Sequence, residues 1–149
     1  MTEALRRNSV TLRDVQGHLD AGVPVDSVVI NKETFLTLSA HWGHGEIVRE
    51  LITRGAPLDW QNIHGDTALT YAIRRERLDI TNMLLDAGAS VVLCGAADPR
   101  SPLQLAARNG WSDVEEKIKA LMEVQLTADK MKLESDLKPL RALRLKTSP

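Results

Sequence analysis

The sequence predicts an all-α solenoid, in which short helix-turn-helix units stack side by side and a C-terminal helical extension follows the last unit. Two observations lead to this fold class. Glycine recurs at a constant interval of 33 residues, at Gly22, Gly55 and Gly88. Within each interval, apolar residues fall at helical spacings of three and four in two short runs, and each run is too short to form a stable helix alone. The helices must therefore bury their apolar sides against neighbouring units.

The repeat is visible when the chain is laid over itself at this interval. The segment TFLTLSAHWGHGEIVRELITRGA, which begins at Thr34, matches TALTYAIRRERLDITNMLLDAGA, which begins at Thr67. A further copy, SPLQLAARNGWSDVEEKI, begins at Ser101, and TLRDVQGHLDAG, which begins at Thr11, parallels HGEIVRELITRG. We therefore expect four units, of which the first has a shortened and charged opening helix.

These motifs resemble the ankyrin repeat, whose pattern has Thr-Pro-Leu-His at the start, Gly-His between the two helices and Gly-Ala at the end. The segments SPLQLAARNG, GHGEIV and LLDAGA carry the resemblance most clearly. It implies an ankyrin-repeat solenoid over residues 1–126, with units at about residues 1–28, 29–61, 62–95 and 96–126. The chain departs from the family pattern at two sets of positions: Thr37, Thr70 and Gln104 replace His, and Phe35 and Ala68 replace Pro.

The second helix of each unit is expected to stop at its glycine. A residue in the left-handed conformation commonly ends a helix, and glycine adopts that conformation without a steric cost. The last unit has Met122 at the corresponding position. Its second helix, which a capping box at Ser112 to Glu115 is expected to start, should therefore continue and close the stack.

The tail, residues 127–149, lies outside the repeat. In its first part, Met131, Leu133 and Leu137 stand among good helix formers, which predicts a capping helix over the open face of the last unit. Pro139 is expected to interrupt that helix. The remainder is either a basic amphipathic segment or a solvated end, because it has no acidic residue and four basic ones: Lys138, Arg141, Arg144 and Lys146.

Composition excludes several classes of protein. The 19 basic and 20 acidic residues give a net charge of −1, which argues against a nucleic-acid binder. The longest apolar run, residues 89–97, is too short to span a bilayer, and the N-terminus lacks the apolar run of a signal peptide. The single cysteine, Cys94, favours a reducing compartment. We therefore expect a cytoplasmic or nuclear protein that does not bind membranes.

The sequence offers little evidence of catalytic or metal chemistry. His41, His44 and Glu46 lie close together, but they lack the spacing and further ligands of known metal sites. His18 is expected to pack as a neutral imidazole, because Leu51 and Leu84 occupy its place in later units. We expect no cofactor, no metal and no enzymatic activity. The alternative is an enzyme or metal-dependent protein whose site has no recognisable motif.

The resemblance implies a concave binding face made of loop tips and the outer ends of the first helices. It also implies that the chain is no substrate of asparaginyl hydroxylation, because Asp26, Asp59 and Val92 stand at the modified position. The two tryptophans of this face are expected to be exposed beside arginines, as in protein interfaces, unless they pack onto neighbouring loops. The expected face comprises Glu33, His41, Trp42, Trp60, His64, Asp66, Arg74, Arg75, Arg100, Arg108 and Asn109.

These observations predict a protein-protein interaction module, an adaptor, regulator or inhibitor, that binds a partner protein through this face. The sequence does not identify the partner. We expect the chain to act as a monomer or as a subunit of a complex with other proteins.

Overall fold

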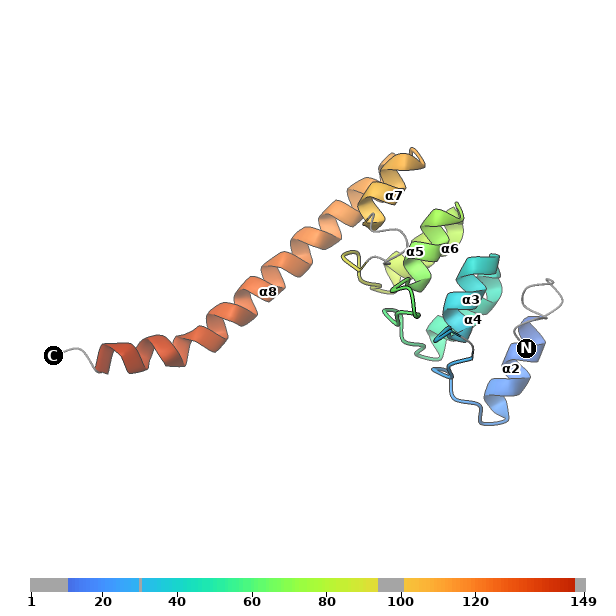
Figure 1. Cartoon of the computed structure of the whole chain (residues 1–149), viewed down its shortest axis with the longest axis horizontal. Helices are drawn as coiled ribbons and strands as arrows, with labels where there is room; N and C mark the ends of the chain where they lie inside the picture. The colour runs from blue at the N-terminus through green and yellow to red at the C-terminus, as the bar shows by residue number, and fades with distance from the viewer. Residues whose placement is uncertain (1–10, 30, 94–100, 147–149) are drawn as a thin grey trace.

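A computed structural model of the chain describes residues 11–29, 31–93 and 101–146. The described residues form a row of short helices followed by one long helix (Figure 1). The helices are α2 (Leu12–Asp20), α3 (Phe35–Trp42), α4 (Gly45–Thr53), α5 (Ala68–Arg74), α6 (Leu78–Asp86), α7 (Pro102–Arg108) and α8 (Ser112–Lys146).

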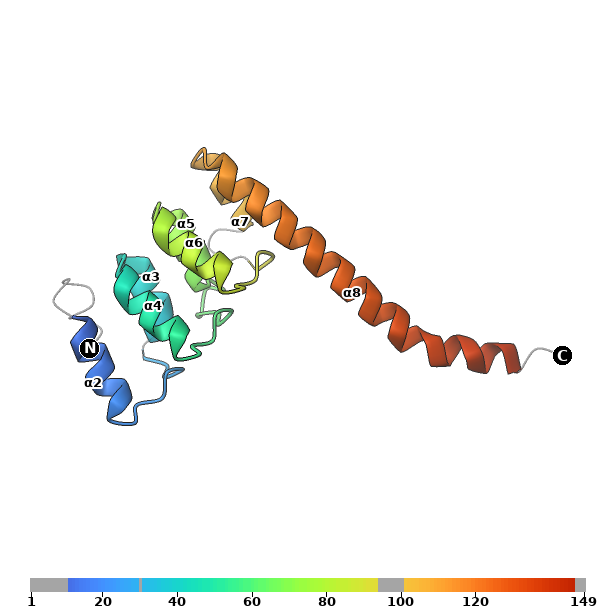
Figure 2. The same cartoon turned by 180° about the vertical axis from the view of Figure 1, so that it is seen from behind.

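The helices stack in two layers. In one layer α3 packs on α5 and α5 packs on α7, while in the other α2 packs on α4 and α4 packs on α6. Antiparallel pairs join the layers, namely α3 with α4, α5 with α6 and α7 with α8. Figure 2 shows the same stack from behind, with α2 at one end and α8 leaving from the other. The predicted helical solenoid is confirmed.

Equivalent positions of successive units form the core. Leu36, Leu69 and Leu105 are fully buried in the layer of α3, α5 and α7, and Leu51 and Leu84 are fully buried in the other layer. Leu36 and Leu69 are 33 residues apart, as are Leu51 and Leu84, so each of these pairs occupies equivalent positions of successive units, whereas Leu105 stands at the position of Tyr71. Burial of each leucine side chain contributes about 2 kcal/mol.

The departures from the family pattern at the helix starts are explained by capping boxes. The hydroxyl of Thr37 accepts from the backbone N of Thr34 at 2.8 Å, and Thr70 repeats this contact with Thr67 at 2.8 Å. In the last pair, Oε1 of Gln104 accepts from the backbone N of Ser101 at 2.9 Å. Each of these side chains therefore satisfies a backbone N–H that the helix itself leaves without a partner.

The recurrent glycines end the helices as predicted. Gly22, Gly55 and Gly88 have φ angles of +92°, +79° and +92°, in the region that side chains rarely adopt. The following residue in each case bonds back into the last turn, as in the contact from the N of Ala56 to the O of Leu51 at 2.9 Å. No atom lies within 4 Å of a Cβ built at any of the three glycines. The backbone conformation, and not lack of space, therefore requires glycine there.

The loops between units are joined side by side. The N of Ile63 donates to the O of Asn31 at 3.2 Å, and the indole Nε1 of Trp60 donates to the O of Lys32 at 2.7 Å. Asp59 accepts from the N of Ser90 at 2.7 Å in the next loop. Asp59, which stands where the resemblance implies a modified asparagine, thus joins two neighbouring loops.

The long helix α8 departs from two expectations. It begins at Ser112 and passes Met122 without a stop, as predicted, but it continues through Pro139 to Lys146. Proline removes only one backbone hydrogen bond and bends a helix that is otherwise intact on both sides. Figure 1 shows α8 changing direction in its red C-terminal part.

The expected cap formed by Met131, Leu133 and Leu137 is also wrong. Met131 is 72% exposed and Leu133 is 59% exposed, because α8 extends away from the stack before it reaches them. The residues that cover the last unit lie earlier in α8, where Val114 and Ile118 are buried.

Two further expectations concern single residues. His18 is exposed on α2, where only Val15 is buried, so the expected packed imidazole is wrong. Cys94 lies outside the described residues. Among the described helices, none combines the length and apolar character needed to cross a membrane.

Candidate functional site

The C-terminal ends of α3, α5 and α7 form one edge of the stack, which we call the inner edge. Because these helices begin at equivalent positions of successive units, their last residues lie in a row. The row contains His41 and Trp42 from α3, Arg74 and Arg75 after α5, and Arg108 and Asn109 after α7. The structure therefore brings together six of the eleven residues that the sequence singled out.

The centre of the inner edge is a contact between two units. Nη2 of Arg75 lies 2.9 Å from Nε2 of His41. The His41 ring stands edge-on to the Tyr71 ring, with a centroid distance of 4.6 Å, and lies at the same distance from the Trp42 ring. These contacts hold the Arg75 guanidinium in place.

Electrostatics keep His41 neutral in this position. Burial lowers the pKa of His41 below its ordinary value, and the positive charge of Arg75 lowers it further, against the opposing effect of Glu33. A neutral imidazole accepts a hydrogen bond from the guanidinium without cancelling its charge. Within the described part of the chain, no carboxylate lies at ion-pair distance from Arg75. The exposed Arg75 therefore presents a positive charge at the inner edge.

Arg74 has a different role from its neighbour. Its guanidinium forms two hydrogen bonds with the buried carboxylate of Asp66, and its Cζ lies 5.5 Å from the centroid of the Tyr71 ring. Asp66 is 2% exposed. The expectation that both residues contact a partner is wrong for Asp66, because the ion pair with Arg74 buries it between the loop and α5.

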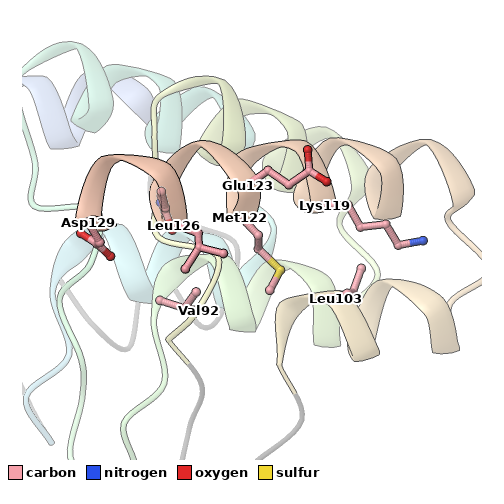
Figure 3. Close-up of a pocket in the computed structure, with 8 residues that line it drawn as sticks. Val92, Leu103, Lys119, Met122, Glu123, Leu126 and Asp129 are labelled. Carbon is pink, nitrogen blue, oxygen red and sulfur yellow. The ribbon is translucent and has the colours of Figure 1, made fainter. Parts of the chain in front are cut away.

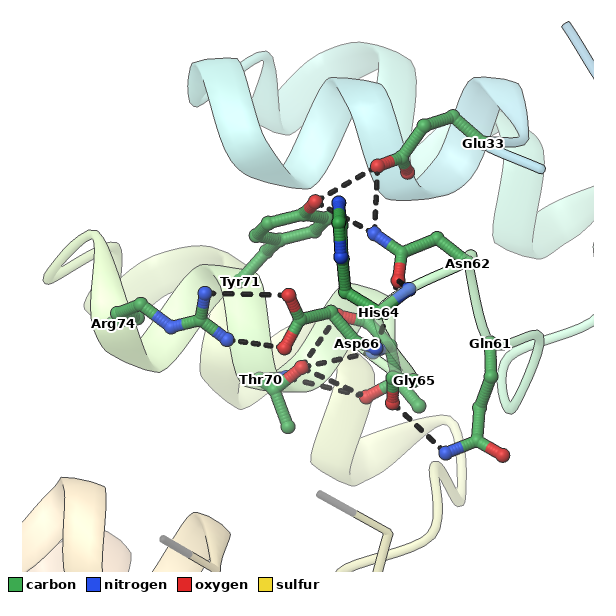
Figure 4. A network of polar contacts seen from close by, with 10 residues as sticks. Glu33, Gln61, Asn62, His64, Gly65, Asp66, Thr70, Tyr71 and Arg74 are labelled. Carbon is green, nitrogen blue, oxygen red and sulfur yellow. Dashed lines mark hydrogen bonds and ion pairs between the residues drawn. The ribbon is translucent and has the colours of Figure 1, made fainter. Parts of the chain in front are cut away.

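A polar network links the loop of one unit to the next helix (Figure 4). Oε1 of Glu33 accepts from Nδ2 of Asn62 and from the hydroxyl of Tyr71, both at 2.8 Å. Oδ1 of Asn62 accepts from the backbone N of His64 at 2.8 Å and of Asp66 at 2.9 Å. Burial raises the pKa of Tyr71 well above its ordinary value, and the hydrogen bond to Glu33 adds to this effect. The phenol therefore stays protonated and donates.

Glu33 is buried by this network and is not a surface contact. Its Oε2 is buried with no hydrogen-bond partner among the described residues, so the carboxylate depends on Asn62 and Tyr71. The expectation that Glu33 lies on the exposed face is therefore wrong. It positions the loop that carries His64, which is exposed.

The two tryptophans are half-buried. Trp60 is held by its hydrogen bond to the O of Lys32, and Trp42 packs against the hydrophobic core. The expectation of fully exposed tryptophans is wrong, and the alternative, that they pack onto neighbouring elements, is closer to the structure. Each still offers part of its surface, because neither is buried.

The last unit contributes one exposed residue and one residue that is hydrogen-bonded to the preceding unit. Arg108 is exposed, whereas Nδ2 of Asn109 donates to the O of Ile73 at 2.7 Å and thereby joins α7 to α5. Arg100 lies outside the described residues.

Two residues that organise the inner edge, Tyr71 and Asn62, were not among the predicted site residues. In the sequence, Tyr71 falls at helical spacing among the apolar residues of its unit. Tyr71 stands at the position that Leu38 occupies one unit earlier. A buried tyrosine hydroxyl usually has a hydrogen-bond partner, so the change from leucine to tyrosine could have indicated a polar contact there. Asn62 offered no comparable signal in the sequence.

The described residues contain no group of three or more His, Cys, Asp or Glu side chains that could hold a metal ion. His41 is occupied by Arg75 and the two aromatic rings, while His44 stands at the N-cap of α4. The arrangement of the inner edge is that of a contact surface built from rings and guanidinium groups.

Comparison with known proteins agrees with this geometry. The family model for ankyrin repeats matches residues 6–93 with three copies. The match covers α2 to α6, and beyond it α7 packs on α5 as α5 packs on α3, and pairs with α8. No curated protein matches the chain.

Proposed function

Because the chain belongs to the ankyrin-repeat family, whose members generally mediate protein binding, we propose that it is a non-enzymatic adaptor, regulator or inhibitor that binds a partner protein through the inner edge. The observation that carries this proposal is the Arg75 guanidinium, which is held by neutral His41, whose ring also contacts half-buried Trp42. Arginine and tryptophan are the residue types that most often dominate binding energy at interfaces.

Preorganisation makes Arg75 a suitable anchor. A free arginine side chain loses rotamer freedom when it binds, whereas Arg75 is already held by His41 in the unbound protein. Its remaining N–H groups are available to a carboxylate, which guanidinium groups bind in a bidentate manner. We therefore propose that the partner presents an acidic side chain to Arg75.

Neighbouring residues extend the surface in both directions along the stack. Arg108 supplies a second exposed guanidinium one unit further on, and His64 lies on the loop beside α5. The residues beneath this surface position it but do not contact the partner; they are Glu33, Asp66 and Arg74. In keeping with the single cysteine, we propose that binding takes place in the cytoplasm or the nucleus.

Affinity purification from the native cell tests the proposal. The variant Arg75→Glu with Arg108→Glu reverses two charges on the inner edge. Its control, Arg13→Glu with Arg49→Glu, makes the same charge change at exposed positions of α2 and α4. We expect the inner-edge variant to lose the partners that wild type and control both retain, with at least about a thirtyfold loss of affinity for a hot-spot pair.

Two results would contradict the proposal. Retention of every partner by the inner-edge variant would move the interface to another face. Loss of the same partners by both variants would show that net charge, and not the inner edge, determines binding. Circular dichroism of both variants confirms that the helical stack is intact.

A further inference from the structure

The part of α8 that extends beyond the stack carries an apolar stripe with no partner in the described structure. The stripe consists of Met122, Leu126, Leu133 and Leu137, and all four are exposed, Leu126 at 70%. Spacings of four, seven and four residues place them on one side of the helix. Val124 and Met131 lie on the opposite side, so the stripe is a distinct surface.

The stripe begins in a groove where α8 leaves the stack (Figure 3). The groove has a volume of about 440 Å³, and its floor is formed by Val92, Leu103, Met122 and Leu126. Glu123, Asp129 and Lys119 also line it, so two carboxylates and one ammonium group border the groove. An apolar groove with an excess of carboxylates favours an occupant that is apolar along one side and basic along its edge.

The C-terminal part of α8 has these properties. It carries Leu137 on the stripe, and it is followed by the basic residues Lys138, Arg141, Arg144 and Lys146. It cannot reach the groove of its own chain, because α8 runs as one helix from the groove to Lys146. We infer that a second copy of this chain supplies the occupant, and that two α8 helices pair antiparallel through their apolar stripes.

Charges along the stripe support the antiparallel direction. When Leu126 faces Leu137 of the second copy, Lys130 falls within one residue of Glu134, and Glu123 falls within one residue of Arg141. Both pairs are of opposite sign, and two-fold symmetry forms each of them twice.

A parallel pair would have the opposite effect. It would place the basic ends of the two helices side by side, with Lys138 and Arg141 on each and no acidic residue after Asp136. Like charges at such short range are destabilising. The antiparallel pair also covers both grooves, whereas a parallel pair would leave the groove at the root of each α8 without a basic occupant.

Pairing also accounts for the helix itself. Beyond Met122 the described residues of α8 are almost all exposed, so the stack does not stabilise them as a helix. In proteins, most of the stability of a helix comes from packing of its apolar side and not from local propensity. The pair differs from the monomer or hetero-complex subunit expected from the sequence, and it leaves the inner edge of each copy free.

Sedimentation equilibrium of the full chain tests the pairing. We expect wild type to be a dimer at about 100 μM, and Leu133→Lys to be a monomer at the same concentration. Met131→Lys is the matched control, because it introduces the same charge at a similarly exposed position on the opposite side of α8 and should remain a dimer. A wild-type monomer, or equal dimerisation of all three proteins, would overturn the inference.

Disulfide cross-linking determines the direction. In a Cys94→Ser background, Leu126→Cys and Leu137→Cys are mixed and oxidised. The antiparallel pair predicts cross-links only between the two different variants, and none for Met131→Cys. Cross-linking of Leu126→Cys to itself would show a parallel pair and would overturn the inference.

Discussion

The central stack and the distal part of α8 use the same kind of secondary structure in opposite ways. The four helices from α3 to α6 contain seven to nine residues each, and every one buries an apolar side. The helix α8 has 35 residues, yet after its first three turns it buries almost nothing in the stack. The length of a helix in this protein therefore does not indicate how much of it is stabilised by packing on the stack.

The difference shows where helix stability comes from in each region. The short helices are too short to persist alone, so tertiary packing and capping must stabilise them. The distal part of α8 depends on local helix propensity and, as we infer, on a second copy. Substitutions should therefore have large effects in the stack and small effects on the distal helix, as long as the chain is monomeric.

Truncation should give the largest difference. Ending the chain after Gly110 removes Val114 and Ile118 and exposes Leu105, so we expect the melting temperature to fall by about 10 °C. Ending it after Leu126 removes side chains that are exposed wherever the structure describes them, and we expect a change within about 2 °C in dilute solution. Thermal melts followed by circular dichroism compare the two. A large fall after Leu126 would show that the distal helix stabilises the stack after all.

Truncation of one leucine side chain should give the second-largest difference in stability between the two regions. Leu84→Ala leaves a cavity at a fully buried position and should lower the free energy of unfolding by about 3 kcal/mol. Leu133→Ala, at an exposed position, should change it by less than about 0.5 kcal/mol. Urea titrations of dilute protein measure both. Comparable losses would mean that Leu133 is covered within a single chain.

Removal of a single hydrogen bond should also affect the stack more than the distal part of α8, but with a smaller difference. Tyr71→Phe deprives buried Glu33 of one of its two donors, and we expect a loss of about 1–2 kcal/mol in the free energy of unfolding. Thr127→Val removes the exposed contact from the Thr127 hydroxyl to the O of Val124, and should cost less than about 0.5 kcal/mol. If Tyr71→Phe is neutral in urea titrations, the network at the inner edge does not stabilise the stack.

One position inside the stack should be open to improvement. The turn between paired helices has a left-handed residue in each unit, which is Gly43, Glu76 or Gly110, and Glu76 has a φ of +56°. Glu76→Gly should relieve this strain and raise the free energy of unfolding by about 0.5–1 kcal/mol. Gly43→Ala should lower it, because Gly43 has a φ of +83°, which alanine adopts only with strain, and the new Cβ would also displace the Arg77 side chain. The opposite signs, read from urea midpoints, test the explanation.

The smallest effect concerns pH. Burial holds the pKa of His41 below its ordinary value of 6.5, so the unfolded chain takes up a proton before the folded one as the pH falls. Stability should therefore decrease from about pH 7.5 to pH 5.5 more in wild type than in His41→Gln, as unfolding midpoints at several pH values will show. If His41→Gln has the same pH dependence, other groups cause it.

Much of the stack could be predicted because its signals are local. Gly22, Gly55 and Gly88 mark helix ends through backbone sterics alone, and the repeat interval brings the ends of α3, α5 and α7 into one row. The expectation about Pro139 failed because a proline inside a long helix costs one hydrogen bond and does not have to end it. The expected exposure of Glu33 and Asp66 failed because their partners, Tyr71 and Arg74, both lie on α5.

The sequence by itself determined the period, the glycines that end the second helices of the units, and the aliphatic core. Those features depend on the conformational preference of each residue and on spacings within one turn. Only the tertiary structure decided which charged residues are buried in pairs, which arginine remains exposed, and where α8 stops packing on the stack. Burial and partner choice are contacts between residues far apart in the chain, so the surface of the protein follows from the stacking of its units and not from any one of them.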